Sequence, residues 1–417
     1  MVRRLSLAGL LSLVCHVAAF SQVSVPLSLH DAIAIAIINN PEAIAANKSI
    51  GAAQGRFWRG ISPPAPIISV SYDYIPAGSG IARFGERVLG VSQSFDFPTT
   101  TVLRGSALTA EIRASEADSR SVAFAIRMQV TDAYYGVLAK QQRLTLAEEN
   151  LRIAVDFEQK ATIRHTVGEG TNLEQLTARV QKTQAQSELE TSHNELGKAV
   201  NELHFALGRG THQPDKEFLL VDSLVYQSQA YEIDSMLAHA YRSNSQLQAA
   251  SFRLAVAADN RGIAWSSLLP SFNASYARYR FAEGTTAYGV ALGISVPVWF
   301  LFDHRGQIQE ATAMYSKAEA ELTARRNLVD AQVRNAVLDF RNADRQVRLY
   351  QEQLLPQAEE IHRVAVSSYQ AGESGYLEYL QARQTLVSVR ASAINTLYAY
   401  HSAVARLEYA IGTPINE

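Results

Sequence analysis

The side chains that could perform chemistry are few, and they do not cluster in this sequence. Ten histidines are scattered over 417 residues, and no two of them stand four positions apart, the helical spacing of many zinc ligands. Glu359, Glu360 and His362 are close together, but a solvated helix face explains them. We find no glycine-rich phosphate loop, nucleophile elbow or Ser/His/Asp set. The sequence therefore predicts no catalytic site, metal site or cofactor, and a protein that is not an enzyme.

The composition predicts a folded chain whose charge is nearly balanced. Apolar residues make up 47% of the chain and charged residues 19%, so large cores can form. The formal net charge is −2, and the basic residues are interspersed with Glu and Gln along the predicted helices. Binding of nucleic acid requires a concentrated basic face, so we exclude nucleic acid as a partner.

The N-terminal segment has the pattern of an export signal. Arg3 and Arg4 precede an apolar run over Leu5–Val14, and small residues follow it. Residues 1–21 are therefore predicted to be a secretory signal peptide. Cys15, the only cysteine, lies inside this segment, so we expect neither disulfide nor thiol chemistry in the mature chain. The alternative of a lipid-modified Cys15 is disfavoured, because the residues just before it lack the usual small side chain.

The chain is a tandem duplication with a spacing of 203 to 204 residues. Val167-Gly168-Glu169 recurs as Ala371-Gly372-Glu373, and Gly208 recurs as Gly412. Each repeat reads as helix, strand, strand, very long helix, break and long helix. The predicted domains are the signal peptide over 1–21, a first repeat over 22–208, a linker over 209–226, a second repeat over 227–412 and a tail over 413–417.

The predicted strands have one apolar and one polar face. Ile68, Val70 and Tyr72 alternate with Ser69 and Ser71, and the second repeat has the same pattern. After the signal no run of about 18 apolar residues occurs, so any membrane crossing must be a closed β-barrel. A half-buried soluble sheet alternates in the same way, but recurrence in both repeats favours the barrel. The strands are predicted over about 66–76, 84–97, 270–281 and 286–298.

The helices are predicted to be unusually long. No proline occurs between Pro98 and Pro214, so the chain could run as a helix roughly 95 Å long before Gly168. Apolar residues recur every seventh position with small residues beside them, which favours a curved wall of closely packed helices. A rod-like coiled-coil scaffold is the alternative, but the strands at the helix ends argue against it. The long helices are predicted over about 101–165, 172–207, 304–370 and 376–411.

A set of short segments carries a recognisable pattern through its order and duplication. The segments are Leu27–Ala32 running into Asn39–Glu42, Val91–Gln93 leading to Pro98, Val130–Tyr135, and the Gly-x-x-x-x-Leu-Glu breaks at Gly168 and Gly372. Together they resemble the outer-membrane efflux protein family typified by TolC, and the resemblance covers the chain from about Leu27 to Gly412. Each segment alone would be a weak signal.

The resemblance implies a homotrimer that is mainly α with a β membrane part. Each chain would give four strands to a 12-stranded β-barrel in the outer membrane, continuous with an α-helical barrel in the periplasm. Four strands leave two open edges and cannot seal a pore, which agrees with a trimer. The implied function is the outer-membrane channel of a tripartite efflux system, a passive conduit whose partners are a periplasmic adaptor (membrane fusion) protein, an inner-membrane efflux pump and outer-membrane lipid.

The resemblance also implies a periplasmic gate at the two glycine breaks. Glu174 and Glu378 match acidic positions near the pore constriction of the family, and three chains would place them in rings that favour cations. A second acidic position falls on Gln381, so we expect less charge there than in TolC. Alternatively, both carboxylates only start the returning helices. The predicted gate residues are Gly168, Glu174, Gly372, Glu378 and Gln381, and the predicted latch residues are Arg179, Tyr369 and Arg383.

The junctions between strand and helix bear on the substrate. Val296–Ile308 and Phe95–Pro98 resemble the heavy-metal-efflux, CzcC- and CusC-like branch of the family, which favours export of metal cations such as cobalt, zinc, cadmium, copper or silver. These residues could equally shape the rim of the barrel. A duct for organic compounds or drugs, or for type I protein secretion, remains the alternative, and an exported non-channel coiled-coil scaffold is the alternative of another class.

Overall fold

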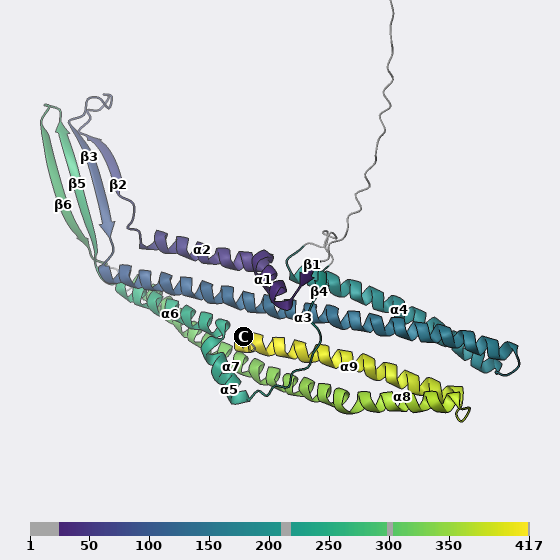
Figure 1. Ribbon diagram of the computed structural model, residues 1–417. Coiled ribbons are helices and arrows are strands. Elements are labelled where there is room, and N and C mark those ends of the chain that lie inside the picture. Colours follow the sequence, from purple (N-terminus) through teal and green to yellow (C-terminus); the bar gives the residue numbers. More distant parts are fainter. Residues whose placement is uncertain (1–24, 210–217, 298–302, 416–417) are drawn as a thin grey trace, which may run out of the picture.

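The computed structural model describes residues 25–209, 218–297 and 303–415 (Figure 1). The predicted signal peptide with Cys15, part of the predicted linker and the junction residues 298–302 lie outside these ranges. Within them, none of the helices combines the length and the apolar character that a membrane-spanning helix requires.

Both repeats fold as the duplication predicts, with a short edge strand before each set of helices. The first repeat contains β1 (Val25–Leu27), α1 (Leu29–Asn39), α2 (Pro41–Ile61), β2 (Ile67–Asp73), β3 (Glu86–Phe95), α3 (Pro98–Thr166) and α4 (Asn172–Ala206). The second contains β4 (Phe218–Leu220), α5 (Ile233–Ser243), α6 (Ser245–Ser266), β5 (Ser271–Phe281), β6 (Thr286–Ser295), α7 (Asp303–Leu349), a π-helical turn (Tyr350–Leu354), α8 (Leu355–Gln370) and α9 (Tyr376–Ile411).

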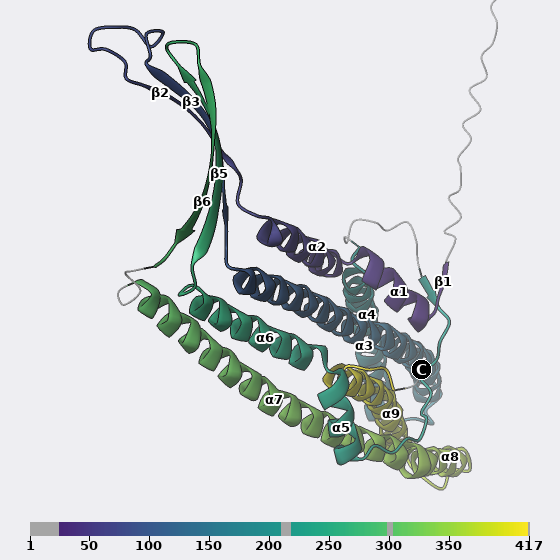
Figure 2. The ribbon, with the colours of Figure 1, turned by 90° about the vertical axis from the view of Figure 1, so that its left-hand side faces the viewer.

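The four long strands form one antiparallel sheet that stands at one end of the molecule (Figure 2). Its order is β2-β3-β5-β6, so β3 and β5 join the two repeats and β2 and β6 are its edges. The helices run away from the sheet side by side: α2 and α4 lie along one side of α3, and α6 and α9 lie along the other (Figure 1). A separate parallel pair joins β1 to β4 near the middle of the helical part.

Small and β-branched residues line the contacts between the long helices. Along α3 the buried residues near the sheet are alanines, which let the neighbouring helices approach closely. Nearer the middle, larger side chains form one core per repeat, around Val130 and Tyr134 in the first and around Val333 and Phe340 in the second. The predicted seven-residue seam is therefore buried in the middle of the molecule, whereas Leu151 towards the tip is only partly buried.

The long helix predicted over about 304–370 is helical throughout the described residues but not α-helical throughout. A π-helical turn over Tyr350–Leu354 separates α7 from α8, and Pro356 is the second residue after it. Proline lacks the backbone N–H and its ring clashes with the carbonyl four residues earlier, so one wider turn accommodates it. Other bounds also differ by a few residues: α3 begins at Pro98, because proline suits a first helical turn, β2 ends at Asp73 and β6 ends at Ser295.

Candidate functional site: the two helix tips

Each long hairpin of helices turns through a glycine in the left-handed conformation. Gly168 has φ 83° between α3 and α4, and Gly372 has φ 74° between α8 and α9. In the first turn, the N–H groups of Glu169 and Gly170 donate to the carbonyl of Arg164 at 2.9 and 3.0 Å. Only glycine adopts this φ without strain, so these two residues end their helices and reverse the chain at both tips.

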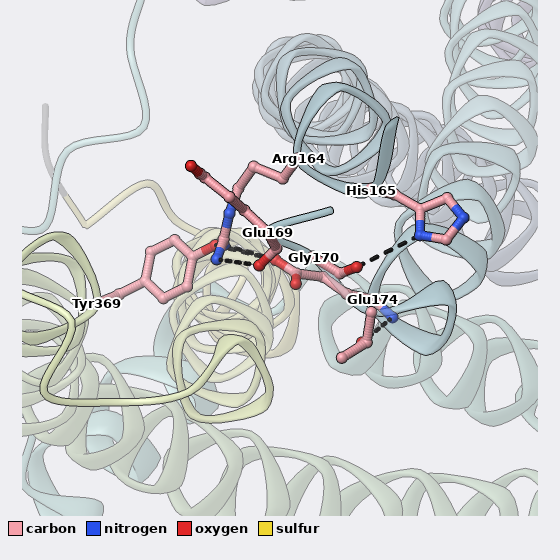
Figure 3. Close-up of polar contacts among 7 residues, drawn as sticks. Arg164, His165, Glu169, Gly170, Glu174 and Tyr369 are labelled. Atoms are coloured by element: carbon pink, nitrogen blue, oxygen red, sulfur yellow. Dashed lines mark hydrogen bonds and ion pairs between the residues drawn. The ribbon is translucent and has the colours of Figure 1, made fainter. Parts of the chain in front are cut away.

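Three side chains join the first tip to the second (Figure 3). The Nη1 of Arg164 donates to the Oε1 of Glu174 at 3.0 Å and also lies 3.0 Å from the hydroxyl of Tyr369. The Tyr369 hydroxyl donates to the same carboxylate oxygen at 3.2 Å. Burial and the charge of Glu174 raise the pKa of Tyr369, so its hydroxyl keeps the proton that it donates. Tyr369 was predicted as a latch residue, and Arg164 was missed.

Glu174 also lies at the start of the returning helix, as the alternative interpretation of the sequence predicted. It lies in the first turn of α4, and its backbone N–H donates to the Oγ1 of the N-cap residue Thr171 at 3.1 Å. Its side chain is only 13% exposed, because the contact with Arg164 and Tyr369 covers it. A carboxylate here suits the positive end of the helix and neutralises Arg164 at the same time.

An aromatic cluster packs the second tip against α3. Phe157 stacks on Tyr376 with ring centroids 4.3 Å apart, and Tyr379 lies 5.7 Å from Phe157 and 5.5 Å from Tyr369. Sequence reasoning missed this cluster, although three tyrosines on the two sides of the turn at Gly372 are a visible signal. Aromatic pairs at these distances stabilise the contact beyond the apolar area that they bury.

The two predicted latch arginines have opposite surroundings. Arg383 is buried on α9, and its Nη2 donates to the backbone carbonyl of Asn150 at 2.7 Å and to its side-chain oxygen at 2.6 Å. Burial lowers the pKa of Arg383. Arg179, at the matching position of α4, is exposed and belongs to neither set of contacts. The structure therefore brings Tyr369 and Arg383 to the junction between the tips and leaves Arg179 outside it.

Glu378 and Gln381 lie in a different environment from Glu174. They line a groove of about 630 Å³ between α8 and α9, together with Ile361, Val364 and Ser368. Both side chains are exposed, and within the described part of the chain Glu378 forms no ion pair. Nowhere in the described part of the chain do His, Cys, Asp and Glu side chains form a group that would bind a metal. Glu360 also lines the groove and pairs with Arg363, so among the described residues Glu378 is the carboxylate of the groove without an ion pair.

Large apolar side chains are exposed around both turns. On the first tip, Ile163, Val167 and Leu173 are 61%, 64% and 67% exposed, and Leu377 on the second tip is 63% exposed. A concentration of exposed apolar residues marks an interaction surface more often than an isolated one does. The tips therefore combine a polar contact between the hairpins with an apolar outer surface.

The family model of the outer membrane efflux protein matches residues 36–209 and 236–413, which together are most of the chain. The chain belongs to the outer membrane efflux protein family. Members of this family are outer-membrane channels that extend into the periplasm, and they are not enzymes, so these three predictions are confirmed. Homologous channels are trimers that combine a helical barrel with a β-barrel, and the predicted fold class agrees with them.

Individual relatives are distant in sequence but similar over their whole length. The cobalt-zinc-cadmium resistance protein CzcC of Cupriavidus metallidurans is 23% identical over 391 residues, which are 93% of this chain and 90% of that protein. The crystal structure of the outer membrane protein VceC of Vibrio cholerae aligns with a TM-score of 0.77 at 21% identity, covering 93% of this chain and 97% of that one. A crystal structure of CusC aligns with a TM-score of 0.76 at 18% identity, covering 94% and 93%.

Proposed function

We propose that three copies of this efflux protein form a passive duct that carries metal cations out of the cell from a periplasmic adaptor and an inner-membrane pump. The observation that carries this proposal is the four-stranded sheet with unpaired edges at β2 and β6. Four strands cannot close a barrel, and an open edge in lipid leaves backbone N–H and C=O groups unsatisfied. Three sheets joined edge to edge would give twelve strands and no edge.

The alternating faces of the strands support the barrel. Ile68 is 70% exposed, Leu292 83% and Ile294 65%, and the register places all three on one face of the sheet. The opposite face carries serines, glycines and Asn273. An apolar outside and a polar inside are what a barrel in a membrane requires.

The tips support the connection to an adaptor. Their exposed apolar side chains would be covered when a partner protein docks on the periplasmic end of the helices. In this proposal the duct itself is passive, and the energy for transport comes from the inner-membrane pump. The duct then only has to open and close.

The contact between Arg164, Glu174 and Tyr369 supports a closed state in which the two hairpins of one chain are held together. Breaking it releases the second hairpin from the first. Glu378, which has no cation beside it, would then form a ring of three carboxylates around the periplasmic entrance. Such a ring raises the local concentration of cations, in keeping with a metal substrate and with the name of the relative CzcC.

Two experiments test the proposal in order. First, the protein should leave membranes only with detergent and migrate as a trimer, and a soluble monomer lacking the signal would contradict the duct. Second, in a planar bilayer Glu378→Gln should lower the preference for cations, whereas Glu310→Gln on α7 is the matched control. Currents unaffected by Glu378→Gln would leave this residue as a helix-start carboxylate.

The substrate is tested separately in cells. We expect that loss of the gene sensitises the host to divalent or monovalent transition-metal cations and that the wild-type chain restores tolerance. Sensitivity to organic compounds with unchanged metal tolerance would assign the duct to the other substrate class.

A further inference from the structure

Three arginines lie at the end of the sheet farthest from the helices. Arg87 is on β3, and Arg278 and Arg280 are on β5. In the antiparallel register Arg87 lies directly opposite Arg280, and Arg278 lies opposite Leu89. Directly opposite residues have Cβ atoms about 5 Å apart, and diagonal neighbours lie within about 8 Å. The three guanidinium groups therefore share one face and one small area of the sheet.

This face is the apolar one. Leu89 lies on it opposite Arg278, and Val290, which is 75% exposed, lies on it opposite Tyr276, two residues farther from the sheet end. Tyr276 and Tyr288 lie at the boundary, with ring centroids 6.1 Å apart, and the guanidinium of Arg278 is 5.9 Å from the centre of the Tyr288 ring. Toward the sheet end the face therefore carries apolar residues, then tyrosines, then cations. This order matches the hydrocarbon, the interface and the headgroups of a membrane.

No carboxylate of the sheet neutralises the arginines. Asp73 and Glu86 pair with each other in the register, and they point to the opposite face because Glu86 directly precedes Arg87. Within the described residues, none of the three arginines forms an ion pair. Like charges directly opposite each other destabilise an antiparallel pair, so Arg87 and Arg280 cost the sheet stability unless an anion lies between them.

We infer that Arg87, Arg278 and Arg280 bind the phosphate of an anionic lipid headgroup in the outer leaflet of the membrane. Arginine forms two parallel hydrogen bonds to a phosphate, and one phosphate within reach of the three guanidinium groups offsets most of the repulsion among them. A lipid fits better than free phosphate because the tyrosines and the apolar rows continue from the arginines to where acyl chains would lie. The inference rests on the proposed trimeric barrel, which turns this face toward lipid.

Binding is tested on the full-length trimer in non-ionic detergent with fluorescent phosphatidic acid as the probe. We expect the R87Q/R278Q/R280Q variant to bind at least about tenfold more weakly, since each lost charge-assisted contact contributes to affinity. The control R113Q/R152Q/R305Q removes three exposed arginines of the helices and should bind within about twofold of wild type. The conservative R87K/R278K/R280K variant should retain most of the binding.

A second measurement separates binding from a structural role. In lipid-free detergent, Arg87→Gln should raise the melting temperature of the barrel, because it removes the repulsion from Arg280. With saturating phosphatidic acid the wild type should have the higher melting temperature, because it binds the lipid more tightly and is stabilised more by it. A merely structural arginine would shift the melting temperature in the same direction with and without lipid.

Each remaining outcome decides between the alternatives. Equal lipid affinity of wild type and R87Q/R278Q/R280Q contradicts the site. Inorganic phosphate that competes as well as the lipid does, or uncharged diacylglycerol that binds equally well, contradicts a phospholipid headgroup as the ligand. Cross-linking of the same samples reports the assembly: a monomeric wild type contradicts both the proposed trimer and this site, whereas a trimer that binds lipid independently of the arginines contradicts the site alone.

Discussion

The tip between α3 and α4 differs from the tip between α8 and α9 at positions that lie 204 residues apart in the chain. Both turn through a left-handed glycine, and both begin the returning helix with a glutamate. Arg164 stands before the first turn, whereas Ser368 stands at the matching position before the second. The first glutamate is therefore paired with a cation inside the chain, and Glu378 is not.

This difference gives the two copies of the turn different electrostatic surroundings, and in the proposed gate they would have different roles. The first tip uses its charge internally, in the contact that reaches Tyr369 of the second tip. The second tip leaves its carboxylate exposed in a groove, where the proposed duct would use it to attract cations. Both tips share the backbone of the turn, and among the positions that differ, Arg164 against Ser368 decides whether the following glutamate has a cation at hand.

The largest expected effect comes from the buried arginine of the second tip. Arg383→Ala would remove the donor to the side-chain oxygen of Asn150 and the second donor to its backbone carbonyl, which also lies within α3, at a cost of about 2–3 kcal/mol. Hydrogen exchange of the first turns of α9 should then be about 30 to 150 times faster, as measured by mass spectrometry on the trimer. Arg179→Ala is the matched control, and we expect less than about threefold change in α4. Equal effects of both substitutions would contradict the distinction between the tips.

The next effect concerns the contact between the tips. Arg164→Ser gives the first tip the residue of the second and removes hydrogen bonds to Glu174 and Tyr369. We expect the open state to gain about 1–2 kcal/mol, or roughly 5 to 30 times in its ratio to the closed state, measured as single-channel openings in a planar bilayer.

Two further variants identify the cause of that gain. Lys160→Ala removes an exposed pair with Asp156 on the same helix and should leave gating unchanged. Tyr369→Phe combined with Arg164→Ser completes a double-mutant cycle, in which a latch gives effects that are not additive. Strict additivity would mean that the two side chains act independently and that they form no latch.

Substituting arginine for Ser368 tests whether the unpaired charge of Glu378 gives the duct its preference for cations. Ser368→Arg places a cation in the groove beside Glu378 and should reduce the preference for cations over anions roughly twofold, because the ring of carboxylates is then neutralised. Ser367→Arg adds the same charge one residue earlier on an exposed position and should have a smaller effect. The reversal potential in a salt gradient measures both. If the two variants shift it equally, Glu378 is not the source of the selectivity.

The sequence predicted the turns well because their cause is local. Gly168 and Gly372 must adopt a φ that other residues avoid, and the spacing from glycine to glutamate is the same in both repeats. The pairing of Glu378 with Gln381 in one groove also follows from their three-residue separation on a helix. Such features need only neighbouring residues.

The contacts between the tips could not be predicted, because they join residues far apart in the chain. Arg164 and Tyr369 are separated by 205 residues, and no local pattern connects them. Arg179 and Arg383 occupy matching positions, yet only Arg383 meets Asn150 of α3. Burial decides their roles, and burial depends on which helices lie side by side. The mismatch of Arg164 with Ser368 was a visible signal for the polar contact, since a duplicated position that differs in charge favours separate roles.

The smallest expected effect lies at the N-cap of the returning helices. Thr171 caps α4 with its side chain, whereas Gly375 starts α9 with φ −81° and ψ 164° and no side chain to accept a hydrogen bond. These angles suit serine, and a Cβ added to Gly375 would meet no atom within 4 Å. Gly375→Ser should therefore stabilise the start of α9 by a few tenths of a kcal/mol.

Hydrogen exchange of the first turn of α9 measures this small gain, and we expect it to slow by roughly a factor of two. The reciprocal Thr171→Gly should speed exchange at the start of α4 by a similar factor, so the two substitutions together would exchange the caps of the two tips. Unequal capping is then a second difference between the two tips, independent of Arg164. If Gly375→Ser slows exchange without changing channel opening, the cap contributes to helix stability alone, and the difference in gating between the tips comes from Arg164 and its absence at Ser368.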